Sequence, residues 1–289
     1  MATGTDIRTF FDGRWHDGDV MIMRAADHGA WLGTTVFDGA RYFEGLVPDL
    51  EPHLARVNRS ALALGITPTM EPGEMVEIAR DGLKAYGSET AVYIRPMYWG
   101  LDGGELGVDV KPGATGFALC LEALPMPAPL KPTTLTTTQF RRPVLADNVV
   151  NAKAGCLYPN NARMLAEARA KGFGNALVAD AMGNVAETAT SNVFMVRDNV
   201  VFTPIANGTF LAGITRARHI DLLRGDGFEV VETVLSFDDF RAADEVFLSG
   251  NMQKVTPVTA FDDTSYQVGP VTRRARALYW EWAQATARL

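Results

Sequence analysis

The chain has 289 residues, of which 47% are hydrophobic and 21% charged, the composition of a globular protein with one large or two ordinary domains. Its net charge of −7 gives no electrostatic support for a nucleic-acid role. Two cysteines and four scattered histidines exclude a disulfide framework and argue against a metal site. Neither a signal peptide nor an apolar stretch of about 20 residues is present, so we expect a cytoplasmic protein.

The first half of the chain alternates strand-like and helix-like segments. The predicted strands are 7–11, 20–29, a strand pair over 33–45 with a turn near Asp38-Gly39, 91–99 and 115–124. Two helices are predicted between them: one over 52–64, with a proline in its first turn and a glycine after its end, and one from 72 to about 87. These elements predict a small two-layer α/β sandwich domain over residues 1–124.

A proline-rich connector separates this domain from the second half. Residues 125–132 contain four prolines, which make a stiff, extended linker. The elements predicted beyond it are strands near 134–140, a helix over 158–172, a hairpin turning at 182–184, a helix over 214–224, a strand at 246–250 and a closing helix. We therefore predict an α/β (α+β) protein whose larger domain, residues 133–289, is strand-rich.

Lys153 is one of only six lysines, against twenty-one arginines, and it lies among small and apolar residues in VVNAKAGCLYP. Burial disfavours the charged form of a lysine, and a neutral amine is what condensation with an aldehyde requires. The alternative is a lysine whose stem packs on apolar surface while its head reaches water.

Two segments of the second half suggest anion and cation binding. GITR, residues 213–216, opens a helix whose first amides suit a phosphate, although an ordinary glycine turn would look the same. Glu187 follows a hairpin among small and β-branched residues, where a carboxylate needs a cation such as a pyridinium, unless it lies solvated at the hairpin edge.

Arginines of the first half are further candidates. Arg56 and Arg59 lie outside the apolar stripe of the helix 52–64, where most arginines are solvated. Tyr93 and Arg95 are two apart on a strand and therefore share one face. Together they could bind a carboxylate or brace a loop, and the residue pattern leaves both readings open.

Taken in order, these segments resemble the fold-type IV enzymes that use pyridoxal 5′-phosphate (PLP), and among them the branched-chain amino-acid aminotransferases. The resemblance covers about residues 9–260, and its strongest stretch runs from NAKAGCLYPNN through VAETATSNVFMV to LAGITR. GTTVFDGARYFEG, HLARVNRSA, YIRPM and FLSGNMQKVTPV support it. The family fold implies that the second domain is a pseudobarrel.

The resemblance implies a role for each matching residue. Lys153 would be the catalytic residue, forming the Schiff base with PLP and moving the proton, and Glu187 would keep the pyridine nitrogen protonated. The other implied cofactor-binding residues are Arg56, Tyr158, Leu211, Ile214, Thr215 and Asn251. The implied substrate-binding residues are Leu32, Phe37, Arg41, Tyr93, Arg95 and Met252.

The resemblance also implies the reaction, a ping-pong transfer of an amino group from an amino acid to a 2-oxo acid. Phe37, Gly39, Tyr93 and Arg95 match the branched-chain pattern, whereas Leu32 and Asn251-Met252 replace a Tyr and a Thr-Ala of that pattern. An (R)-selective amine or D-amino-acid transaminase is therefore the main alternative. An aminodeoxychorismate lyase and a non-enzymatic binding protein fit less well. Relatives of this fold place the active site at a subunit interface, which implies a homodimer or a larger homo-oligomer.

Overall fold

The computed structural model describes residues 4–289, and the contacts between residues divide the chain into two compact units. Unit 1 comprises the residues up to Met126, together with Ala152–Leu157 and Ala283–Leu289, and unit 2 comprises Pro127–Asn151 and Tyr158–Trp282. The first division falls inside the predicted linker 125–132. The predicted domain 133–289 includes two short stretches that the contacts group with unit 1, and the first three residues of the predicted domain 1–124 lie outside the described residues.

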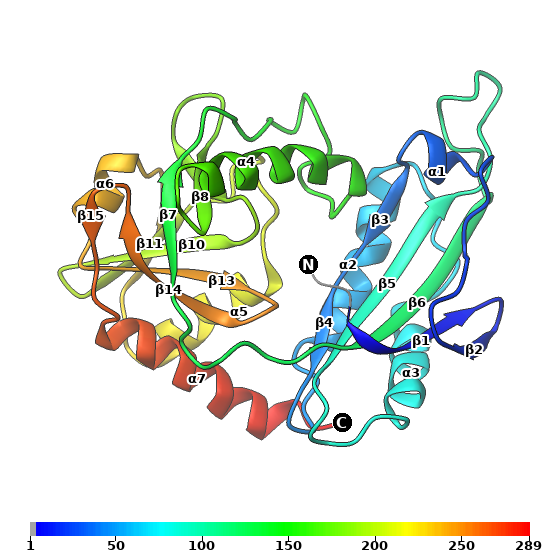
Figure 1. Ribbon diagram of the computed structural model, residues 1–289, viewed down its shortest axis with the longest axis horizontal. Coiled ribbons are helices and arrows are strands. Elements are labelled where there is room, and N and C mark those ends of the chain that lie inside the picture. Colours follow the sequence, from blue (N-terminus) through cyan, green and yellow to red (C-terminus); the bar gives the residue numbers. More distant parts are fainter. Residues whose placement is uncertain (1–3) are drawn as a thin grey trace. The chain divides into compact units, whose positions relative to one another are not determined.

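Unit 1 contains a six-stranded sheet with two helices on one face (Figure 1). The strand order is β2-β1-β6-β5-β3, β4 also pairs with β5, and all neighbours are antiparallel. The strands are β1 (Thr5–Phe11), β2 (Arg14–Asp17), β3 (Thr35–Phe37), β4 (Ala40–Tyr42), β5 (Val92–Gly100) and β6 (Thr115–Ala123). The helices are α1 (His28–Trp31), α2 (Leu50–Ala63) and α3 (Pro72–Leu83), of which α2 and α3 cover the sheet.

Helix α2 packs through the apolar stripe that its sequence predicts. Leu54, Val57 and Ala61 recur at helical spacing and are all fully buried. Arg56 lies next to this stripe and is itself buried, unlike most arginines beside an apolar face. The helix therefore carries a buried cation as well as core residues.

The predicted strand over 20–29 is wrong. Asp12 and Gly13 both have positive φ, 52° and 75°, so they form a tight turn and the chain returns at once as β2. The strand that follows the turn is therefore β2, and residues 20–27 form no strand.

The predicted strand pair over 33–45 is also corrected. β3 and β4 do not pair with each other; both run antiparallel to β5, one after the other. The hydrogen-bond ladder is interrupted at Asp38-Gly39, opposite Pro96. Because proline has no N–H to donate, the remaining bond here is the one that the Pro96 carbonyl accepts from the Asp38 N–H at 3.1 Å. The interruption turns the Asp38 side chain away from the ladder and toward α2.

Unit 2 contains a nine-stranded mixed sheet in the order β12-β11-β10-β13-β14-β7-β8-β9, with β15 beside β14. The strands are β7 (Thr133–Thr137), β8 (Asn175–Ala179), β9 (Val185–Thr188), β10 (Asn192–Arg197), β11 (Val200–Pro204), β12 (Val230–Thr233), β13 (Glu245–Gly250), β14 (Lys254–Phe261) and β15 (Thr264–Ser265). The sheet curls so that β9, at one end of this order, also contacts β10 and β11. This curled sheet agrees with the predicted strand-rich pseudobarrel.

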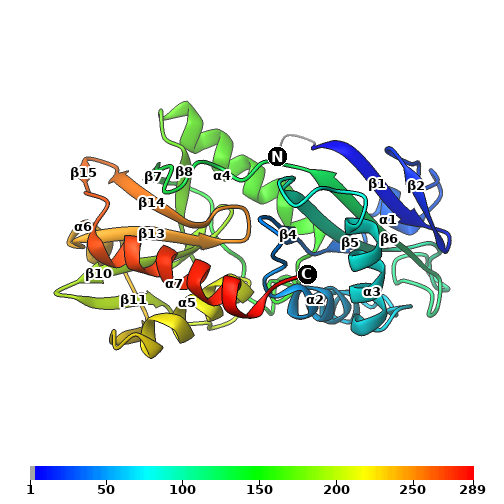
Figure 2. The same cartoon turned by 90° about the horizontal axis from the view of Figure 1, so that it is seen from below.

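Helices pack on both sides of the unit 2 sheet (Figure 2). They are α4 (Tyr158–Ala170), α5 (Ile214–Gly225), the short α6 (Phe237–Arg241) and α7 (Pro270–Thr286), whose last turn belongs to unit 1. Met164 and Ala168 of α4 pack on β8, whereas Ile220 of α5 and Leu278 of α7 join the core with Phe247 of β13. Both units combine helices with sheets, which confirms the predicted α+β class.

Across residues 4–289, no helix is both long and apolar enough to cross a membrane. The same residues contain no group of three or more His, Cys, Asp or Glu side chains arranged to hold a metal ion.

Candidate active site

Lys153 belongs to unit 1 although most of its sequence neighbours belong to unit 2. Its N–H donates to the Ser60 hydroxyl at 3.0 Å, and its carbonyl accepts from the Phe37 N–H at 3.1 Å. Its Nζ lies 4.8 Å from the centre of the Phe37 ring. Both backbone groups are therefore anchored, and the amine is half-buried beside an aromatic face.

Arg56 is held by Asp38, a residue that the sequence analysis missed. Its Nε and Nη2 donate to the two Asp38 carboxylate oxygens at 2.6 and 2.9 Å, and His53 Nδ1 lies 2.7 Å from the same carboxylate. Burial opposes ionisation of Asp38, but the charges of Arg56 and His53 outweigh burial and hold the pKa of this carboxyl below its usual range. The guanidinium predicted to bind phosphate is thus fixed in direction by a buried carboxylate.

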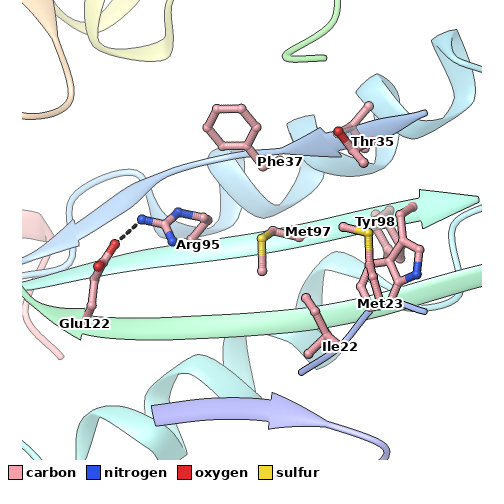
Figure 3. Close-up of a pocket in the computed structure, with 10 residues that line it drawn as sticks. Ile22, Met23, Thr35, Phe37, Arg95, Met97, Tyr98 and Glu122 are labelled. Atoms are coloured by element: carbon pink, nitrogen blue, oxygen red, sulfur yellow. Dashed lines mark hydrogen bonds and ion pairs between the residues drawn. The ribbon is translucent and has the colours of Figure 1, made fainter. Parts of the chain in front are cut away.

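A cavity of about 380 Å³ opens in unit 1 (Figure 3). Its lining is largely aliphatic, aromatic and thioether, and is made by Ile22, Met23, Thr35, Val36, Phe37, Arg95, Met97, Tyr98, Trp99 and Glu122. Two of the predicted substrate-binding residues, Phe37 and Arg95, are in this set, and the other charged member, Glu122, forms an ion pair with Arg95.

The remaining predicted substrate residues of unit 1 lie outside this lining. The Arg95 guanidinium stands 5.0 Å from the Tyr93 ring centre, so the two share one face as their spacing predicts. Arg41 is fully buried and donates to the Leu124 carbonyl at 2.5 Å; burial lowers its pKa to about 10, although Tyr93 and Glu122 oppose this effect. Leu32 caps α1 and is 41% exposed.

Glu187 lies buried on β9 of unit 2, paired with a cation. Its Oε1 is 3.2 Å from Arg142 Nε, and its Oε2 accepts from Asn192 Nδ2 at 3.2 Å. Arg142 is fixed in turn, because its Nη2 donates to the Thr188 carbonyl at 2.8 Å. A buried cation and an amide donor both favour the ionised form of this carboxylate.

The start of α5 provides backbone amides next to the Glu187 group. Gly213 is the N-cap and offers no side-chain cap, so the amides of Ile214 and Thr215 have no partner within the helix. A Cβ on Gly213 would stand 2.2 Å from Asn192 Oδ1, which explains the glycine. Asn192 Nδ2 also donates to the Leu211 carbonyl at 3.1 Å, linking the predicted ring-packing residue to Glu187.

A second turn of unit 2 follows β13 and contains Asn251, with Ser249 just before it on the strand. Ser249 Oγ lies 2.8 Å from His219 Nδ1, and the buried Lys254 donates through Nζ to Asn251 Oδ1. Burial, and next the nearby Lys254 charge, lower the pKa of His219 to about 3. Met252 is half-buried in the same turn. The turn therefore combines a fixed amide side chain with a buried positive charge.

Tyr158, the predicted partner of the cofactor's phenolic oxygen, is the first residue of α4 and is half-buried.

Several of these partners escaped the sequence analysis, namely Asp38, Glu122, Arg142, Asn192 and Lys254. One signal existed for Lys254, because it lies among the apolar residues of QKVTPV just as Lys153 lies among small ones. Asp38, Glu122 and Arg142 gave no local sign, since their partners are distant in the sequence, and Asn192, only five residues from Glu187, gave none either.

These residues fit a phosphorylated aldehyde cofactor with a ring nitrogen. An amine, a carboxylate paired with a cation and uncapped helix amides are the groups that suit an aldehyde, a protonated ring nitrogen and a phosphate.

Residues 35–261 match the family model of the class IV amino-transferases. The chain therefore belongs to the class IV aminotransferases, and the predicted family and enzyme class are confirmed.

Among its relatives, the branched-chain-amino-acid aminotransferase of Salmonella typhimurium is 32% identical over 280 residues, which cover 92% of this chain and 89% of that protein. The crystal structure of an aminotransferase from Brucella abortus bound to PLP has a TM-score of 0.95 and 59% identity, covering 96% of this chain and 99% of that one. The branched-chain aminotransferase of Thermoproteus uzoniensis with norvaline has a TM-score of 0.88 and 27% identity, covering 97% and 95%.

Proposed function

We propose that this protein is a PLP-dependent transaminase that transfers the amino group of branched-chain amino acids to 2-oxo acids. The observation that carries the substrate class is the cavity of unit 1, whose walls are mainly apolar and which has room for a branched side chain. The branched-chain relatives and the PLP-bound relative support the same conclusion.

When bound, PLP supplies an aldehyde that condenses with amines and a ring that accepts electrons. In our proposal Lys153 Nζ would hold the cofactor covalently and would carry the proton to and from the substrate α-carbon. The Glu187 carboxylate, which is paired with Arg142, would accept a hydrogen bond from the protonated ring nitrogen. The Tyr158 hydroxyl would hydrogen-bond the phenolic oxygen of the ring.

We assign phosphate binding to backbone amides and to side chains. The amides of Ile214 and Thr215 would donate to the phosphate, Arg56 would contribute its charge, and Asn251 would add a polar side chain. Leu211 would pack on the ring. Leu32, Phe37, Arg41, Tyr93, Arg95 and Met252 are proposed to shape substrate binding, Arg41 from its buried position opposite Tyr93 in the sheet.

Replacing Lys153 by alanine tests the cofactor assignment. Purified wild-type protein should be yellow, whereas Lys153→Ala should bind no PLP covalently and lose turnover with every donor, because no other amine takes its place. Lys84→Ala is the matched control, since that lysine side chain is 74% exposed and should leave both properties unchanged. Normal transamination by Lys153→Ala would show that the assignment is wrong.

A donor panel tests the substrate class. We expect activity with L-leucine, and little with D-alanine or an (R)-arylalkylamine, when each is combined with pyruvate and with 2-oxoglutarate. Activity with the amine alone would replace the branched-chain assignment by the (R)-amine alternative. An assembly of at least two copies is part of the same proposal and rests on the family resemblance.

A further inference from the structure

Arg95 and Glu122 form an ion pair within the cavity of unit 1 (Figure 3). They lie on neighbouring antiparallel strands, β5 and β6, and Glu122 stands directly opposite Tyr93 in the register. Arg95 lies two residues beyond Tyr93 on β5, diagonally across from Glu122. The side chains of Tyr93, Arg95 and Glu122 are therefore on one face of the sheet. The pair is therefore built into the sheet.

The other residues that line the cavity carry no charge, so this ion pair determines how the cavity interacts with a charged substrate. Arg95 and Glu122 are the charged members of a lining that otherwise contains apolar, aromatic and thioether side chains and one threonine. A guanidinium in such surroundings is a strong ligand for a carboxylate, because it offers paired donors and is little screened by water. In this chain the carboxylate is supplied internally, by Glu122.

Both partners are held in place. Glu122 is only 1% exposed, and its Oε2 also accepts from the Gly4 N–H at 2.7 Å. A side chain at Gly4 would meet the Ala123 carbonyl at 2.6 Å, so only glycine brings its backbone this close. Arg95 rests on the Tyr93 ring, 5.0 Å from its centre. Glu122 is thus fixed from two sides and cannot swing away without losing both bonds.

We propose that Glu122 is a specificity-determining residue that neutralises Arg95 and thereby disfavours substrates with a second carboxylate. A dicarboxylic substrate would have to displace Glu122 or approach it as a like charge, whereas an apolar side chain does neither. The inference rests on the proposed function, in which this cavity receives the substrate side chain. It makes monocarboxylic amino acids and 2-oxo acids the preferred substrates, and 2-oxoglutarate a poorer acceptor than a monocarboxylic 2-oxo acid.

Glu122→Gln tests the inference in the holoenzyme. Glutamine keeps the volume and an oxygen for the Gly4 N–H, but it removes the charge. With L-valine as the common donor, we expect the ratio of kcat/KM for 2-oxoglutarate to that for 4-methyl-2-oxopentanoate to rise about 10- to 100-fold, the range of one charged hydrogen bond. The double variant Arg95→Gln/Glu122→Gln should lose this gain, because the freed guanidinium is its source.

Equilibrium binding gives a readout that is independent of turnover. The Kd values of glutarate and of 4-methylpentanoate, a monocarboxylate of similar reach, are measured from the absorbance of the bound cofactor. Glu122→Gln should bind glutarate at least about tenfold more tightly, with 4-methylpentanoate little changed. Equal melting temperatures and PLP contents establish that the variants are folded.

Wild-type protein supplies a second test that needs no variant. It should bind glutarate at least about tenfold more weakly than 4-methylpentanoate. Equal or tighter binding of glutarate, or an unchanged ratio in folded Glu122→Gln, overturns the inference about Glu122. Wild-type protein that transaminates no branched-chain amino acid overturns the proposed function instead, so the two failures are distinguishable.

Discussion

His219 is a buried imidazole whose Nδ1 contacts Ser249 Oγ at 2.8 Å. Burial and the Lys254 charge lower its pKa to about 3, so it stays neutral in the folded protein over most of the acid range. In the unfolded chain a histidine binds a proton near pH 6.5. Between these two values the unfolded state holds one more proton, and stability is lost as the pH falls.

Replacing His219 by asparagine should remove this acid sensitivity. The asparagine amide keeps a polar atom near Ser249 but does not titrate. The free energy of unfolding is measured with urea at pH 6.5 and at pH 5. It should fall between these pH values in both proteins, but the fall in the variant should be smaller by up to about 1.4 kcal/mol per pH unit. Ser249→Ala, which keeps the imidazole, should lower stability without flattening the slope. Identical slopes for His219→Asn and wild type would contradict the assigned direction of the shift.

At the scale of elements, the start of α5 is tied to β9 and β10 through one side chain. Asn192 Nδ2 donates to Glu187 Oε2 and to the Leu211 carbonyl, and its Oδ1 occupies the space beside Gly213. The backbone φ of Gly213 is −72°, which alanine adopts without strain. A substitution at Gly213 therefore acts through crowding alone.

Gly213→Ala should displace Asn192 and weaken its bond to Glu187. We expect a loss of about 1–3 kcal/mol in the free energy of unfolding, the usual cost of overpacking, together with weaker PLP binding. Gly225→Ala, at the other end of α5, is the matched control. A Cβ there meets nothing within 4 Å, so the better helix former should stabilise the protein slightly. Equal effects of the two changes would exclude the role given to Asn192.

At the scale of the whole molecule, the chain does not divide into two consecutive halves. It leaves unit 1 after Met126, returns for Ala152–Leu157, and returns again for Ala283–Leu289. In this last stretch the Ala287 carbonyl accepts from the Val47 N–H at 2.7 Å, and the Leu289 N–H donates to the Gly45 carbonyl at 3.1 Å. The C-terminal residues are thus part of the fold of unit 1.

Deleting residues 283–289 should therefore destabilise unit 1. Hydrogen exchange should show that the Val47 amide loses its protection, because its acceptor has been removed. Arg288→Ala is the control, since that side chain is exposed and the backbone pairing remains. Unchanged protection at Val47 after the deletion would refute the structural role of the C-terminus.

The sequence by itself determined most of the elements and the chemical character of the site. The apolar spacing of Leu54, Val57 and Ala61 defined α2, and the setting of Lys153 and Glu187 marked them as unusual. Periodicity and neighbouring residues are local properties, so a single chain displays them.

Only the tertiary structure decided which groups meet. Glu187 is paired with Arg142, Arg95 with Glu122, and Lys153 with Phe37, and these partners lie far apart in the sequence. The same holds for the ladder that breaks opposite Pro96. Such pairs depend on strand register and on the path of the chain, and those are fixed by packing of the whole sheet rather than by the residues beside each partner.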